Sequence, residues 1–107
     1  MKEVIKADSD SVVSVENVSE DKFYVLEQIH VKNFAIIHKN SYFDFRHGVY
    51  EGWCFSNKFT AGNSYNFDGH QKTLRGFIEK ALSWPKIFKV YEFETAREML
   101  LFLAERV

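Results

Sequence analysis

The sequence predicts an α+β fold, in which an antiparallel, meander-rich sheet of four to six strands carries two C-terminal helices packed on one face. Three observations lead to this prediction. Residues 71–83 and 96–107 have apolar side chains at helical spacing, and residues 86–93 between them are rich in β-branched and aromatic residues. Apolar segments before residue 56 are separated by short turn-like connections, which join antiparallel strands rather than parallel ones.

The first helix is predicted from apolar residues at positions i, i+3, i+4, i+7 and i+8, namely Leu74, Phe77, Ile78, Ala81 and Leu82. Pro85 lacks a backbone N–H and biases Trp84 away from helical dihedrals, so the helix is expected to end near Ser83. Gly76 lies inside this helix, where glycine costs ~1 kcal/mol relative to alanine. We therefore expect another group to approach Gly76 closely.

The second helix is predicted to begin with a capping box. In that motif the Thr95 hydroxyl accepts a hydrogen bond from the Glu98 N–H, and the Glu98 carboxylate reaches back to the Thr95 N–H. The apolar stripe that follows is formed by Ala96, Met99, Leu100, Leu103 and Val107, is widened by Phe102, and leaves out Leu101. The segment 86–93 is expected inside the sheet, because both of its alternating rows are partly apolar.

The remaining strands are expected from the first two-thirds of the chain. Residues 1–10 contain few large apolar side chains and are expected to be a mobile terminus, whereas residues 11–18 are a candidate strand. Residues 19–32 fit either a strand or a short helix capped by Ser19, and alternation of apolar residues favours the strand. Further strands are expected over residues 34–38, 42–46 and 49–55, with turns at 39–41 and 47–48.

Composition is that of one globular domain, residues 1–107, with 46% hydrophobic and 27% charged residues. No segment approaches the ~20 apolar residues that cross a bilayer, and the first residues lack a signal-peptide core, so a cytoplasmic location and no membrane partner are expected. Cys54 is the only cysteine. A disulfide within the chain and a cysteine-based zinc site are therefore excluded.

Residues with potential for chemistry form no recognised motif. The four histidines, His30, His38, His47 and His70, with Asp44 or Asp68 as a carboxylate, have none of the spacings of metal-binding pairs. We expect neither a metal nor another cofactor. Asp44, His47 and Glu51 lie on one predicted hairpin and could transfer protons, but a solvent-facing strand carries the same residues by default. A small enzyme that uses these three residues is the least favoured class, and no catalytic activity is expected.

Aromatic residues concentrate in the middle of the chain, where nine of the 18 lie between Tyr42 and Phe67. They either form a small apolar cluster beneath the 56–68 loop or remain exposed for binding. The second alternative predicts a partner-binding surface of aromatic and basic residues: Lys39, Tyr42, Arg46, Tyr50, Lys58 and Tyr65.

This predicted surface leads to a functional hypothesis. We interpret the chain as a non-catalytic protein-binding module that regulates or inhibits a macromolecular partner, a class common among phage and mobile-element accessory proteins. The alternative is a single-stranded nucleic-acid-binding protein, but a net charge of −1 and a pI near 6.4 favour a protein partner. A homodimer through a sheet edge is a further expectation, because the candidate edge strands 11–18 and 49–55 contain no proline.

Overall fold

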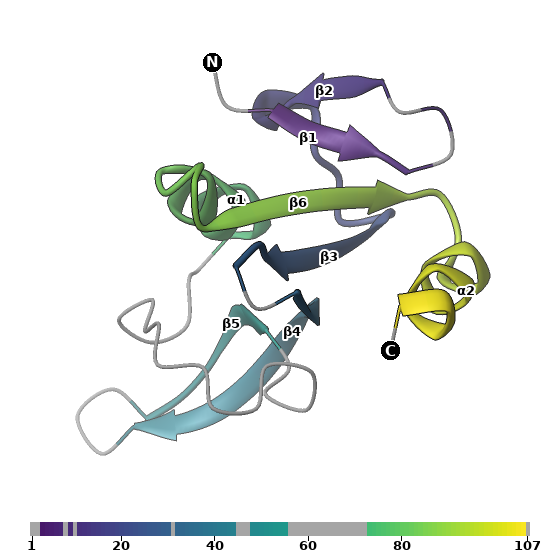
Figure 1. The fold of residues 1–107 in the computed structure, drawn as a ribbon. Coiled ribbons are helices and arrows are strands. Elements are labelled where there is room, and N and C mark those ends of the chain that lie inside the picture. Colours follow the sequence, from purple (N-terminus) through teal and green to yellow (C-terminus); the bar gives the residue numbers. More distant parts are fainter. Residues whose placement is uncertain are drawn as a thin grey trace.

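The computed structural model describes residues 3–7, 9, 11–30, 32–44, 48–55 and 73–106, with residues 33, 40–44 and 48–55 described by their backbone. Figure 1 shows the elements, which are β1 (Glu3–Lys6), β2 (Val12–Ser14), the short 3-10 helix η1 (Val15–Asn17), β3 (Phe23–Gln28), β4 (Asn33–Asp44), β5 (Gly48–Phe55), α1 (Leu74–Leu82), β6 (Phe88–Phe93) and α2 (Ala96–Arg106). The α+β class is confirmed.

The six strands form one sheet in the order β2-β1-β6-β3-β4-β5, within the predicted range of four to six. The sheet is mixed, because β1 and β6 run parallel, with Ile5 opposite Tyr91, while the other neighbours are antiparallel. The segment 86–93 lies inside the sheet as predicted. The candidate edge strands also take the two ends of the sheet order, as β2 and β5.

The predicted mobile terminus over residues 1–10 is wrong for Glu3–Lys6, which forms β1 between β2 and β6. Val4 is 0% exposed and belongs to the core cluster beneath α1. One well-placed valine and two neighbouring strands therefore order a segment that has few large apolar residues. Residues 11–18 contain the predicted strand only in part, since β2 ends at Ser14 and η1 follows.

Two local predictions in the middle of the chain have opposite outcomes. The strand favoured for residues 19–32 is confirmed as β3, which pairs with β4 on one side and β6 on the other. The turn predicted at residues 39–41 is wrong, because β4 runs through it with Lys39 opposite Trp53 and Ser41 opposite Glu51. Polar composition indicated a turn there, but cross-strand pairing along β5 extends the strand instead.

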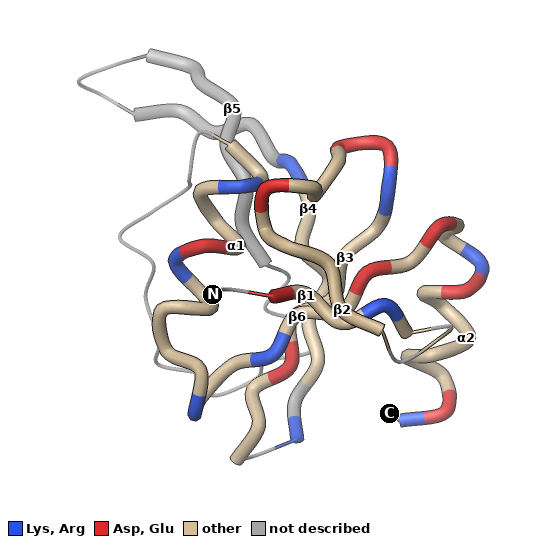
Figure 2. Tube along the Cα trace, turned by 90° about the horizontal axis from the view of Figure 1, so that it is seen from above, with Lys and Arg blue, Asp and Glu red and all other residues tan. Residues whose placement is uncertain are grey.

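The helices pack on opposite faces of the sheet, so the prediction that both cover one face is wrong. Successive strand residues point to opposite faces. Leu26 on β3 belongs to the cluster with Phe77 and Ile78 of α1, whereas its neighbour Val25 belongs to the cluster with Met99 and Leu103 of α2. Figure 2 accordingly shows the two helices on either side of the central strands. Apolar residues at both odd and even positions of β3 and β6 require cover on both faces.

Helix α1 follows the prediction closely. The Thr73 side chain caps it by accepting a hydrogen bond from the Gly76 N–H at 2.9 Å, and the helix ends at Leu82, shortly before Pro85. A Cβ added at Gly76 would lie 2.9 Å from the Thr73 Oγ1. The predicted close approach to Gly76 is therefore made by the hydroxyl that caps the helix.

Helix α2 is capped by Thr95, whose Oγ1 accepts from the Glu98 N–H at 3.2 Å, as the first half of the predicted capping box requires. Its buried stripe is narrower than predicted, because Leu100 is 56% exposed. Phe102 packs against the sheet, and its ring centre lies 5.0–5.7 Å from three other rings, those of Phe34, Tyr91 and Phe93. Within the part of the chain described, no helix is long and apolar enough to cross a membrane.

Candidate functional site

Strand β4 is long because it pairs first with β3 and then, further along the chain, with β5. It pairs with β3 from Asn33 to Ile37 and with β5 from Ile37 to Asp44. Residues 38–44 and 48–54 therefore make a two-stranded ribbon that continues past the end of β3, and we call it the β4–β5 arm (Figure 1). Seven residues at ~3.3 Å per residue give the arm a length of roughly 23 Å.

The arm carries three of the six predicted partner-binding residues. Tyr42 on β4 lies directly opposite Tyr50 on β5, and Lys39 lies opposite Trp53. Arg46, Lys58 and Tyr65 lie outside the described residues. The register therefore brings two aromatic positions of the predicted surface together, and the predicted surface as a whole stays a prediction.

The residues considered for proton transfer occupy different register positions. Asp44 lies opposite Gly48, whereas Glu51 lies opposite Ser41, three positions further along the ladder. Three residues correspond to ~10 Å along a strand. His47, the proposed third member, lies outside the described residues. The backbone register therefore does not set Asp44 and Glu51 across from each other.

The two described histidines that were candidates for metal binding lie in different parts of the fold. His30 is exposed in the turn after β3, and His38 lies on β4 opposite Cys54. His47, Asp68 and His70 lie outside the described ranges. Among the residues whose side chains are described, no group of three His, Cys, Asp or Glu residues could hold a metal ion.

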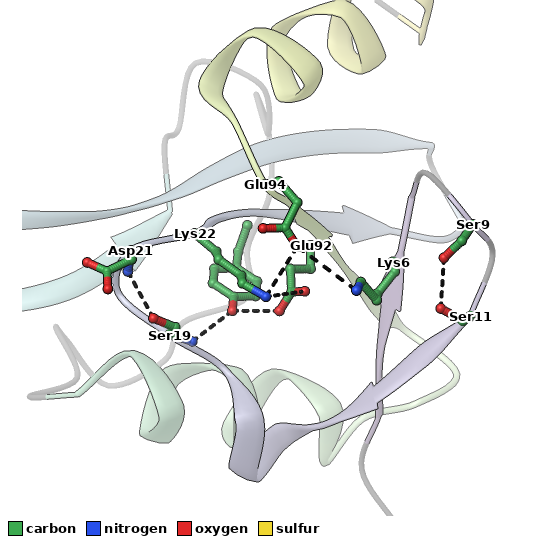
Figure 3. Close-up of polar contacts among 9 residues, drawn as sticks. Lys6, Ser9, Ser11, Ser19, Asp21, Lys22, Glu92 and Glu94 are labelled. Atoms are coloured by element: carbon green, nitrogen blue, oxygen red, sulfur yellow. Dashed lines mark hydrogen bonds and ion pairs between the residues drawn. The ribbon is translucent and has the colours of Figure 1, made fainter.

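A buried charge network that the sequence patterns did not predict lies where β1, β3 and β6 meet (Figure 3). We call it the Glu92 network, and its members are Lys6, Ser19, Lys22, Tyr24, Glu92 and Glu94. The Glu92 side chain, 3% exposed, accepts a hydrogen bond from the Tyr24 hydroxyl at 2.8 Å. That hydroxyl accepts in turn from the Ser19 N–H at 2.9 Å.

Lysine side chains neutralise the two carboxylates of the network. The Lys22 ammonium lies 3.6 Å from Glu92 Oε1 and 3.2 Å from Glu94 Oε1, and the Lys6 ammonium lies 4.0 Å from the same Glu94 oxygen. The hydrogen bond to Glu94 and the charge of Glu92 raise the pKa of Lys22 above its usual range. Lys22 therefore stays charged at neutral pH.

The Tyr24 hydroxyl likewise stays protonated, because burial and its bond to Glu92 favour the neutral form. Burial raises the pKa of the Tyr24 hydroxyl well above its usual range, and its hydrogen bond to Glu92 acts in the same direction. The hydroxyl therefore remains a donor to the buried carboxylate. Among the described residues, Glu92 Oε1 is buried without a hydrogen-bond partner and has only the charge of Lys22 3.6 Å away, whereas the other contacts join β1, β6 and the 19–22 turn.

A signal for this network was present in the sequence. Glu92 occupies the same alternating row of the predicted internal strand as Phe88 and Val90, both of which are 1% exposed. A charge in an apolar row requires a buried partner, because an unpaired buried charge is very costly. What sequence pattern alone does not identify is the partner, Tyr24, which lies 68 residues away.

No family model matches this chain, and comparison with curated proteins and with solved structures likewise finds no match.

Proposed function

We propose that this protein is a non-catalytic module that binds a protein partner through the β4–β5 arm and regulates or inhibits that partner. The supporting observation is the arm itself, which continues for seven register positions beyond the last pair of β4 with β3. A two-stranded hairpin on its own is marginally stable in water. Docking on another molecule would add stability to a ribbon extended in this way.

The composition of the arm supports a protein as that molecule. Aromatic residues are enriched at the centres of protein interfaces, and the arm sets Tyr42 opposite Tyr50. Charge points in the same direction, because residues 38–55 contain one lysine and one arginine against one aspartate and one glutamate, a balance of zero. Surfaces that bind nucleic acid carry a basic excess, so single-stranded nucleic acid remains the second candidate.

Regulation follows from the kind of contact proposed. A module of 107 residues that binds without converting its partner acts by covering a surface or by displacing a competitor. The arm would insert at or beside the partner's functional surface. Inhibition or modulation of the partner's activity is the expected outcome.

The test begins by identifying the partner. Tagged protein is used to capture partners from native host lysate, which are identified by mass spectrometry, and the affinity of each purified candidate is then measured by calorimetry. We compare wild type with a Tyr42→Ala/Tyr50→Ala variant and with Val12→Ala, a matched exposed apolar control on β2 at the opposite edge of the sheet. The arm variant should weaken binding by about tenfold or more, as for two interface aromatics, and the control should not.

Two results would contradict the proposal. Equal affinity of wild type and the arm variant would show that the partner binds elsewhere. Tight binding of a mixed oligonucleotide that falls steeply with salt and is lost in Tyr42→Ala would favour the nucleic-acid alternative, because phosphate neutralisation releases counterions.

A further inference from the structure

Helix α2 has a second apolar surface on the side away from the sheet. Its buried side chains are Met99 and Leu103, yet Leu100 and Leu101 are 56% and 55% exposed. Together with the exposed residues Arg97 and Ala104, these leucines occupy positions i, i+3, i+4 and i+7, and we call them the outer stripe. Exposed leucines scattered singly are ordinary, but two adjacent ones on one helix face form a patch.

The position of α2 leaves this patch accessible. Figures 1 and 2 both place α2 at the periphery of the molecule, and Figure 2 shows charged positions at its two ends with uncharged residues between. A groove of about 280 Å³ lies beside Leu101, with apolar walls from Ala7, Phe93 and Phe102 and a charged rim formed by Glu98, Glu105 and Arg106. The groove extends the apolar area from the outer stripe toward the sheet.

The charges that flank the outer stripe are complementary to those of a second copy. Arg97 and Glu105 each lie four residues from Leu101, one on each side. If two α2 helices pack antiparallel with Leu101 on the two-fold axis, Arg97 of each copy lies opposite Glu105 of the other. A parallel arrangement would instead place like charges together.

We propose that α2 is a dimerisation helix, and that two copies of this chain pack their outer stripes against each other, antiparallel, across a two-fold axis. The proposal is independent of the arm and differs from the sheet-edge dimer expected from the sequence, because it uses neither β2 nor β5. Eleven residues give a helix of roughly 16 Å, so the interface is smaller than that of a permanent dimer. We therefore expect a reversible dimer with micromolar affinity.

The test is sedimentation equilibrium of the full chain over roughly micromolar to several hundred micromolar concentration. Wild type should shift with concentration from the monomer mass of 12.6 kDa toward twice that mass. Leu101→Lys should remain monomeric, because the two-fold axis sets one introduced lysine against the other. The variant should stay folded, since the introduced ammonium group has Glu98 and Glu105 at helical spacing, and a circular dichroism melt checks this.

Val12→Lys is the matched control, because Val12 is 51% exposed but lies on β2 at a sheet edge. It should dimerise like wild type. Arg97→Glu and Glu105→Arg should each weaken the dimer by about fivefold, and the double variant should recover wild-type affinity.

Three outcomes would overturn the proposal. The first is a wild-type chain that stays monomeric over the whole concentration range. The second is a dimer that survives Leu101→Lys or disappears in Val12→Lys, which would indicate pairing through the sheet edge. The third is a charge-swapped double variant that does not recover, which would exclude the antiparallel two-fold arrangement.

Discussion

Replacing Tyr24 with phenylalanine removes a single hydroxyl from the Glu92 network and keeps the ring that packs in the core. That hydroxyl donates to Glu92 Oε2 at 2.8 Å and accepts from the Ser19 N–H at 2.9 Å. Tyr24 and Glu92 are 2% and 3% exposed. Because the site is shielded from solvent, the carboxylate loses a donor that water does not readily replace.

The expected loss of stability follows from these two bonds. A hydrogen bond to a charged group contributes ~1.5–3 kcal/mol, and a bond between neutral groups contributes ~0.5–1.5 kcal/mol. The Ser19 N–H is only partly buried, so water can recover part of the second contribution. We therefore expect Tyr24→Phe to lower the free energy of unfolding by about 2–4 kcal/mol, a large part of the ~5–15 kcal/mol typical of a domain.

Urea unfolding followed by circular dichroism measures this loss, and Tyr91→Phe is the control. The Tyr91 hydroxyl also donates to a carboxylate, Glu27 Oε1 at 2.6 Å, but that pair is only partly buried. Water can replace the lost donor there, so we expect a loss of about 0.5–1.5 kcal/mol. If Tyr24→Phe costs no more than Tyr91→Phe, the buried carboxylate does not depend on the Tyr24 hydroxyl and the reasoning fails.

Three further predictions concern the helices and alkaline pH. Phe77→Ala should lower the free energy of unfolding in urea by ~3–5 kcal/mol, because Phe77 is 1% exposed. Thr95→Ala should lower it by ~1 kcal/mol through the lost helix cap. The reverse order would show that α1 does not pack on the core as described. Gly76→Ala should not raise the melting temperature of the wild-type chain, because the added Cβ would lie 2.9 Å from Thr73 Oγ1. In a Thr73→Ala background the same substitution should raise the melting temperature, since alanine is the better helix former. A higher melting temperature in both backgrounds would refute the close contact. Burial raises the pKa of the Tyr91 hydroxyl, so the unfolded chain loses this proton first and the free energy of unfolding should fall as pH rises above ~10. The fall should be less than ~1.4 kcal/mol per pH unit, because Tyr91 is partly exposed. In urea melts the Tyr91→Phe variant should show a shallower fall with pH than wild type, and an unchanged slope would contradict this.

Local signals predicted the elements of the C-terminal part well. The spacing of the α1 side chains, the Thr95 cap and the β-rich segment before it depend on residues only a few positions apart, so one sequence contains the necessary information. The same holds for β3, where alternation favoured a strand over a helix. Boundaries shifted by only a few residues, because caps and proline limit where a helix can begin and end.

Long-range pairing explains most of the errors. Strand β1 is ordered by β6, more than eighty positions along the chain, and nothing within residues 1–10 indicates that partner. The turn expected at 39–41 disappears because β5 pairs across it. The placement of the two helices on opposite faces, by contrast, is predictable from the sequence. Two apolar rows on an internal strand imply cover on both faces, and both rows of residues 86–93 are partly apolar in the sequence.

The candidate site was predicted less completely than the fold. A hairpin over residues 42–55 was expected, and its register does set Tyr42 opposite Tyr50. The extension of that hairpin past the end of β3 was not expected, because it depends on where β3 stops relative to β4. Helical spacing predicts Leu100 of the outer stripe in the buried face of α2 and places Leu101 off that face. The structure instead leaves both leucines exposed, while the ring of Phe102 packs against Phe93 of the sheet.

The place of β6 in the sheet has a consequence for how the chain folds. Strand β6 is the last of the six along the sequence, yet it lies between β1 and β3. While the chain is being synthesised, the β1–β2 pair and the β3–β4–β5 meander can form separately, but within the described part of the chain only β6, residues 88–93, pairs with both of them in the sheet. Until that strand is made, β1 and β3 each present an unpaired edge, which is the kind of surface that aggregates or recruits chaperones. The sheet is therefore completed only when β6 has been synthesised, and its completion closes the long loop between β1 and β6.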